Sequence, residues 1–103
     1  MDAELNALKA ALVAAGEDRY ASMIQMALSN EGERESILTS NELWDGAGSV
    51  ADQAGLQSRD KEARARIEKA LMHLGQRQLE KGVINQRTEF WVSAFEAMHA
   101  QSI

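Results

Sequence analysis

Residues 43–52 read LWDGAGSVAD and interrupt a sequence whose pattern is otherwise helical. Gly46 and Gly48 stand one residue apart, and a glycine in a helix interior costs roughly 1 kcal/mol relative to alanine. Ser49 and Asp52 follow with the spacing of a capping box, in which a side-chain oxygen accepts a hydrogen bond from a backbone N–H three residues later. The segment therefore predicts a tight connection at the two glycines and the beginning of a short helix after them.

The composition on either side of this segment favours helices. The chain has 103 residues, no proline and only two Trp, one Tyr and two Phe. Proline breaks helix interiors, and sheet proteins are rich in aromatic and β-branched residues. A chain of this length is sufficient for one domain and too short for two of ordinary size. We therefore expect a single helical domain over residues 1–103, an all-α bundle of four to five helices with an irregular glycine-rich connection near residues 45–49.

Helical spacing of apolar residues and cap signals set the expected boundaries of the other helices. The predicted helices begin at Asp2 as a cap, at Glu17 or Asp18, at Glu33, after Ser49, after Ser58 and after Asn85. The helix after Ser58 is predicted to be the longest, ending at Lys81 before Gly82, with Gly75 allowing a neighbouring helix to cross closely. In the last helix the residues predicted to face inward are Phe90, Trp91, Ala94, Phe95 and Met98.

The charge is negative overall and unevenly distributed. The formal net charge is −5, with 10 acidic and 3 basic residues in 1–57 and 6 acidic and 8 basic residues in 58–103. The simplest interpretation is that the two halves pack with matched surfaces; the alternative is an acidic face for a basic partner. No basic stripe with interleaved aromatic residues is present, so we do not expect nucleic-acid binding.

Several classes of protein are disfavoured by what the sequence lacks. It has no cysteine, which excludes disulfides, thiolate nucleophiles and cysteine-based metal sites. Residues 1–4 lack the basic region of a secretory signal, and no apolar stretch approaches the roughly 20 residues of a membrane span. We expect a cytoplasmic protein without a membrane anchor.

The glycine segment is the one candidate ligand site. Gly46, Gly48 and Ala51 have the Gly-x-Gly-x-x-Ala spacing of dinucleotide-binding loops, but the preceding residues are predicted to be helical, whereas that fingerprint needs a strand before it. A helix beginning at Ser49 still offers free backbone donors to an anion. The predicted ligand-binding residues are Trp44, Gly46, Gly48, Ser49 and Asp52, and the alternative is a purely structural turn and cap.

Neither histidine is predicted to take part in chemistry. Glu96 and His99 form a Glu-x-x-His pair, half of the ligand pattern of di-iron bundles, but the residue three before His73 is Ala70. His73 is predicted to lie on the surface. No metal, no other cofactor and no catalytic residues are expected, so we do not expect an enzyme; were there one, Asp45, Ser49 and Asp52 would be the residues to test.

The central segment resembles a family of small, functionally uncharacterised bacterial helical proteins that share a Gly-Gly-x-Gly-Ser-apolar-x-Asp pattern. The matching residues are 45–52, in which Asp45 stands at the first glycine of the pattern. The resemblance implies no activity, cofactor or partner. It marks Gly46, Gly48, Ser49 and Asp52 as a structural signature.

Helical patterning without an assembled chemical site favours a non-catalytic interaction protein. Val13, Met26 and Met72 lie off the main apolar stripes and would be covered by another copy of the chain, with the long helix or the last helix as the contact. Two alternatives stay open: an immunity or antitoxin-like protein with an acidic face, and a module that binds a small ligand or anion at Gly46–Ser49.

Overall fold

Seven helices and no strand make up the regular structure of residues 1–100, the part of the chain that the computed structural model describes. The helices are α1 (Asp2–Ala14), α2 (Asp18–Ser29), α3 (Glu31–Leu38), α4 (Asn41–Trp44), α5 (Val50–Gln53), α6 (Ala63–Lys81) and α7 (Thr88–His99). The all-α prediction is therefore confirmed for this range. No helix in it is both long and apolar enough to cross a membrane.

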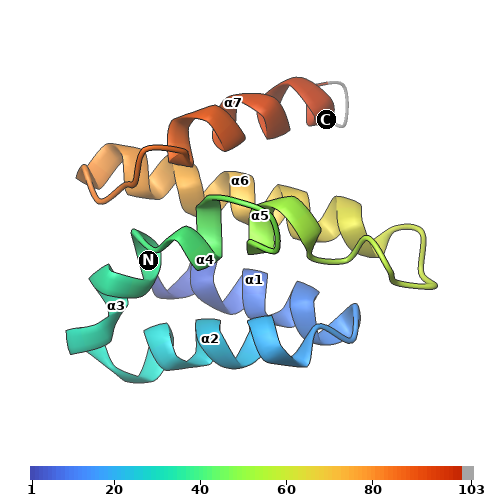
Figure 1. The fold of residues 1–103 in the computed structure, drawn as a ribbon, viewed down its shortest axis with the longest axis horizontal. Coiled ribbons are helices and arrows are strands. Elements are labelled where there is room, and N and C mark those ends of the chain that lie inside the picture. The colour runs from blue at the N-terminus through green and yellow to red at the C-terminus, as the bar shows by residue number, and fades with distance from the viewer. Residues whose placement is uncertain (101–103) are drawn as a thin grey trace.

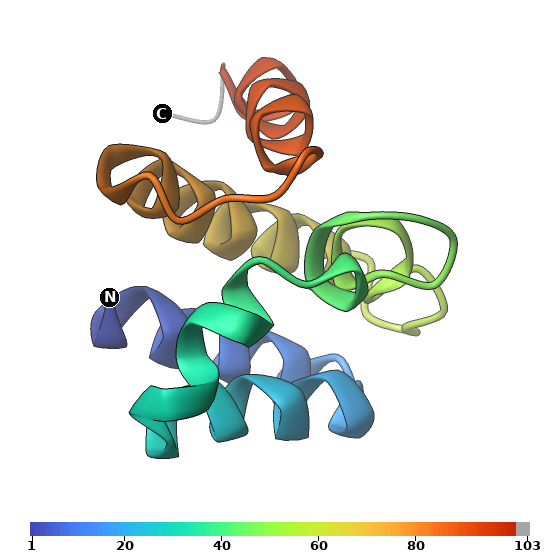
Figure 2. The ribbon, with the colours of Figure 1, turned by 60° about the vertical axis from the view of Figure 1, so that its left-hand side comes forward.

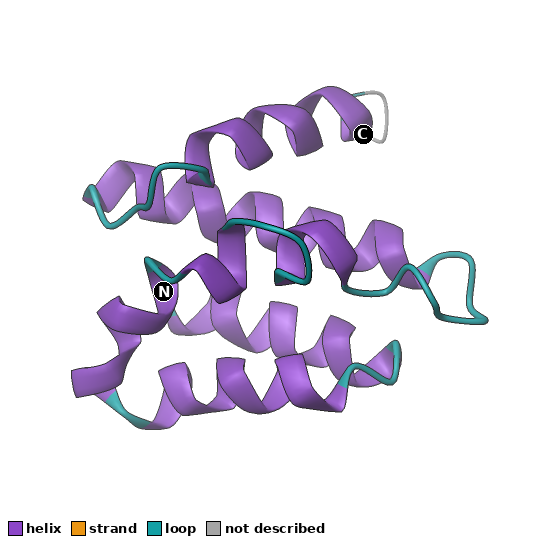
Figure 3. Cartoon of the chain, in the orientation of Figure 1, coloured by secondary structure: helices purple, strands orange, loops and turns teal. Residues whose placement is uncertain are grey.

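The longer helices pack side by side in the order α2, α1, α6, α7 (Figure 1). The short helices α4 and α5 cross in front of this row, and α3 turns away at one end of it (Figures 1 and 2). Loops join the helices, and the longest of them, residues 54–62, connects α5 to α6 (Figure 3). This order places α1 between α2 and α6, so that two of its sides are covered by neighbours.

The core lies between the row of helices and α4–α5. Leucine and isoleucine side chains at helical spacing supply most of it, and Trp44 and Phe95 are its largest members. The fully buried large side chains include Leu5, Leu8, Leu12, Ile24, Leu43, Trp44, Ile67, Leu71, Leu74 and Phe95. In α1 the buried row is Leu5, Leu8, Ala11 and Leu12, and in α6 it includes Ala63, Ile67, Ala70, Leu71 and Leu74.

The helical segment predicted from Glu33 to about Trp44, whose continuity the polar Ser40 and Asn41 left open, is divided into α3 and α4. The Ser40 hydroxyl donates to the Ile37 carbonyl and accepts from the Leu43 N–H, so it ends one helix and caps the next. This break, together with the single turns α4 and α5, gives seven helical segments within residues 1–100 where four or five were expected.

The predicted start of the longest helix is wrong. It begins at Ala63 and not after Ser58, because Ser58 and Asp60 accept hydrogen bonds from backbone N–H groups two residues further on and form local turns. The predicted end is correct: the helix stops at Lys81, and Gly82 takes the left-handed conformation with φ of +72°.

Two other caps differ from their predictions. Asp2 lies inside α1 and pairs with Arg34, so it caps nothing. Asn85 does accept hydrogen bonds from the backbone N–H groups of Arg87 and Thr88, but α7 begins only at Thr88. Asn85 therefore organises the turn before the helix and does not cap its first residue.

The face of α7 that packs inward also differs from the prediction. Phe95 is fully buried, as predicted, but Phe90 and Met98 are 53% and 55% exposed, and Thr88 and Val92, which were not predicted to face inward, are buried. Apolar residues cover so much of this helix that their spacing did not define one inward face.

Gly75 brings α6 and α7 close together, as predicted. A Cβ atom at this position would collide with Cγ2 of Val92 and lie 3.1 Å from Cη2 of Trp44. The missing side chain thus allows both neighbours to pack directly on the backbone of α6.

Candidate functional site

The glycine segment is a tight turn followed by a helix cap. Gly46 and Gly48 have φ of +90° and +88°, values that other residues rarely adopt. The Ser49 hydroxyl accepts a hydrogen bond of 3.2 Å from the Asp52 N–H, as the capping box predicts. The reciprocal half is absent, since the Ser49 N–H bonds to the Gly46 carbonyl and the Asp52 carboxylate accepts from Gln53.

Two of the predicted ligand-binding residues, Trp44 and Ser49, are buried, whereas Gly46 and Gly48 are exposed. Trp44 is fully buried and its indole N–H donates to Oε1 of Gln78 on α6, at 3.1 Å. Ser49 is 2% exposed, and the Gly48 carbonyl accepts a 2.6 Å hydrogen bond from the Tyr20 hydroxyl. These contacts give the segment a structural role, and ligand binding there stays a prediction.

Gln78 was missed by the sequence analysis. Besides accepting from Trp44, its amide nitrogen donates to the carbonyls of Leu38 and Val83, each at 2.8 Å. The only signal in the sequence was its place four residues after Leu74, in the buried row of the long helix. A polar residue there indicates a buried hydrogen-bonding partner.

Glu96 and His99 are held by different parts of α6. Gln76 donates to Glu96 at 2.9 Å, while Nε2 of His99 lies 2.9 Å from the carboxylate of Glu68. Glu68 also pairs with Arg64 at 2.9 Å, so this partly buried cluster ties the end of α7 to α6. Within residues 1–100, no group of three or more metal-ligating side chains converges on one point.

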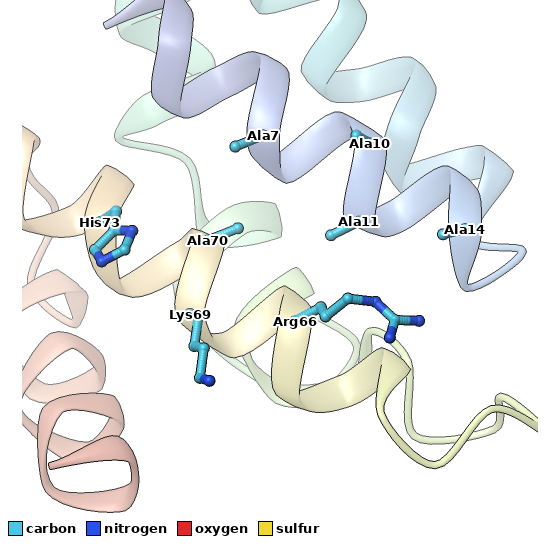
Figure 4. Close-up of a pocket in the computed structure, with 8 residues that line it drawn as sticks. All are labelled: Ala7, Ala10, Ala11, Ala14, Arg66, Lys69, Ala70 and His73. Atoms are coloured by element: carbon cyan, nitrogen blue, oxygen red, sulfur yellow. The ribbon is translucent and has the colours of Figure 1, made fainter. Parts of the chain in front are cut away.

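A groove of about 410 Å³ runs between α1 and α6 and is the candidate functional site (Figure 4). On the α6 side it is lined by Ala70 together with Arg66, Lys69 and His73. Figure 4 shows Arg66 extending alongside the end of α1, with Lys69 pointing away from α1. The α1 side is lined entirely by alanine: Ala7, Ala10, Ala11 and Ala14.

The alanines of α1 form a regular stripe. Ala3, Ala7, Ala10 and Ala14 are all exposed, and their separations of four, three and four residues are those of the seam of a coiled coil. Methyl side chains let a second helix approach closely. The stripe is therefore shaped for helix packing, although nothing within residues 1–100 covers it.

The edge of the groove along α6 is positively charged. Arg66 pairs with Asp60, and this guanidinium lowers the pKa of the Asp60 carboxyl below its usual value. Lys69 forms no ion pair with the described residues, and His73 is exposed, as predicted. The groove thus has an apolar floor, and along its α6 edge Arg66 is paired with Asp60 while Lys69 points away from α1 (Figure 4).

Comparison of the chain with family models, with curated proteins and with solved structures gives no match. The resemblance of residues 45–52 to a bacterial family therefore stays a prediction.

Proposed function

We propose that this protein is a non-catalytic interaction protein that holds a helix of another polypeptide in the groove between α1 and α6. The observation that carries the proposal is the exposed alanine seam on the floor of that groove. Coiled-coil seams bury such positions against a partner helix, and small side chains favour close packing of the two backbones.

The charge at the groove indicates the chemistry of the helix. Arg66 and Lys69 stand along one edge, so a helix with carboxylates on its flank is favoured over a basic one. The apolar floor requires that the same helix present small or apolar side chains at helical spacing. An acidic amphipathic helix has both features.

The test is cross-linking from the groove in the cells that produce the protein. A small diazirine amino acid replaces Ala10, and the matched control places it at Gln57, which is exposed in the turn before α6. We expect light-dependent adducts with a polypeptide from position 10 and none from position 57. Equal yields of adduct from the two positions, or no adduct from either, would contradict the proposal.

A further inference from the structure

We propose that Asp45 is a site of spontaneous isomerisation to isoaspartate, and that Gln86 and Arg87 restrain this reaction in the folded chain. The proposal is independent of the groove between α1 and α6. It starts from the sequence, in which Asp45 and Gly46 form the one pair where glycine follows an aspartate or an asparagine. Glycine has no side chain to hinder attack of its nitrogen on the preceding carboxyl group, so this pair is the most reactive of its kind in the chain.

The reaction is an intramolecular condensation followed by hydrolysis. The backbone nitrogen of Gly46 attacks Cγ of Asp45; a C–N bond forms, the amide proton is lost and one carboxyl oxygen leaves as water. Water then opens the resulting succinimide ring. Attack at Cγ breaks the new bond and restores aspartate, whereas attack at the backbone carbonyl breaks the original peptide bond. The second product is isoaspartate, in which the main chain runs through Cγ, and water is the only co-reactant.

The attacking nitrogen is accessible in the fold. Gly46 is exposed, and within residues 1–100 its N–H donates to no acceptor. The N–H of Asp45, in contrast, donates to the Asn41 carbonyl at 2.8 Å. No hydrogen bond has to break at the nucleophile, so the position of the Asp45 carboxyl group decides whether the ring can close.

That carboxyl group is held by the loop that leads into α7. Nε2 of Gln86 donates a hydrogen bond to Oδ2 of Asp45, and Nε of Arg87 lies 3.8 Å from Oδ1. Each carboxylate oxygen therefore has a partner on the same loop, and the side chain is only 26% exposed. Ring closure would have to move Cγ relative to both partners, which opposes the reaction.

The backbone at Asp45 is a second restraint. Closure of the ring needs Cβ of Asp45 and the nitrogen of Gly46 nearly eclipsed about the Cα–C bond. The ψ angle of Asp45 is 133°, in the extended region, so this bond must rotate by roughly 100°. Trp44 is fully buried before it, and the Gly48 carbonyl is bonded to the Tyr20 hydroxyl after it. We therefore expect the folded chain to react much more slowly than the unfolded one.

Isoaspartate would lengthen the glycine turn. It adds one CH₂ group to the main chain between the buried Trp44 and the Gly48 carbonyl. The hydrogen bond from the Ser49 N–H to the Gly46 carbonyl, at 3.2 Å, lies within the same short connection. The contacts that position α5 therefore depend on Asp45 remaining unmodified.

The first test compares the full chain, held for weeks in one buffer, with and without concentrated guanidinium chloride. Endoproteinase Asp-N cleaves before aspartate and not before isoaspartate, so resistance to cleavage before Asp45 reports the modification; Asp52 and Asp60 are internal references. We expect isoaspartate to accumulate at least about tenfold faster in the unfolded chain. Equal rates would contradict the restraint, and no isoaspartate in the unfolded chain would show that Asp45 is not a site.

A matched pair of double variants tests the two side chains. Gln86→Ala with Arg87→Ala removes both partners of the Asp45 carboxylate. Gln76→Ala with Arg77→Ala removes the same residue types from α6, where they bond to other carboxylates at the surface. Without denaturant, we expect the first variant to form isoaspartate at least about threefold faster than the parent and the second to match the parent. Equal rates in the first variant and the parent would overturn the proposal.

A less stable variant would also react faster, and a further measurement separates this effect. Urea denaturation gives the unfolded fraction of each variant, and its product with the rate of the fully unfolded chain is the contribution of global unfolding. A rate for the variant lacking Gln86 and Arg87 that exceeds this product supports restraint by the two side chains. A rate equal to the product would overturn it.

Discussion

The amide of Gln78 is fully buried and joins three segments that are far apart in the sequence. It accepts from the indole of Trp44 and donates to the carbonyls of Leu38 and Val83. All the polar atoms of this side chain thereby have partners, and so do two backbone carbonyls near the ends of helices. This residue holds α4 and the end of α3 against α6.

Gln78→Leu should lower the free energy of unfolding by about 2–4 kcal/mol, because it leaves one buried N–H and two carbonyls without their partner. Urea denaturation measures the change. The control is Gln76→Leu, whose amide bonds to Glu96 at the surface and which should change stability by less than about 0.5 kcal/mol. Equal stability of the Gln78→Leu variant and the parent would contradict the role given to this side chain.

At the scale of the element, α7 is attached to the rest of the molecule mainly through α6. Gly75 and Val92 make the close contact near the middle of the two helices, and the pair of Glu68 and His99 joins the end of α7 to α6. The opposite flank of α7 leaves Phe90 and Met98 more than half exposed. The spacing of α6 and α7 therefore depends on one missing side chain.

Gly75→Ala should destabilise the protein by about 1–3 kcal/mol, because the added methyl group collides with Val92 and forces α7 outward. In an unobstructed helix the same substitution would stabilise by up to about 1 kcal/mol. Urea denaturation followed by tryptophan fluorescence measures the effect, with Ser93→Ala on the exposed side of α7 as the control. A Gly75→Ala variant more stable than the parent would show that the two helices are not in close contact.

For the molecule as a whole, a partner helix held in the groove between α1 and α6 would bind only the folded state, and its binding would therefore add to the stability of the fold. A ligand or partner that binds only the folded state raises the midpoint of unfolding by mass action.

Local signals predicted some element boundaries well and others poorly. Gly82 ends α6 as predicted because a left-handed glycine terminates a helix wherever the helix packs. The beginning of α6 was misplaced because Ser58 and Asp60 satisfy nearby backbone donors in turns, and a turn and a cap use the same residue types. In α7, apolar residues lie on several sides of the helix, so their spacing did not indicate which side packs against the rest of the protein.

Sequence patterns alone predict that the regular structure of residues 1–100 is helical, where the glycine turn lies and that Ser49 caps the helix after it. These features depend on backbone preferences and on hydrogen bonds within three residues. The packing of distant segments, in contrast, sets the hydrogen bond from the Trp44 indole to Gln78, the exposure of Phe90 and Met98, and the groove between α1 and α6. Such features depend on contacts between segments distant in the chain, which the spacing of residues along one helix does not encode.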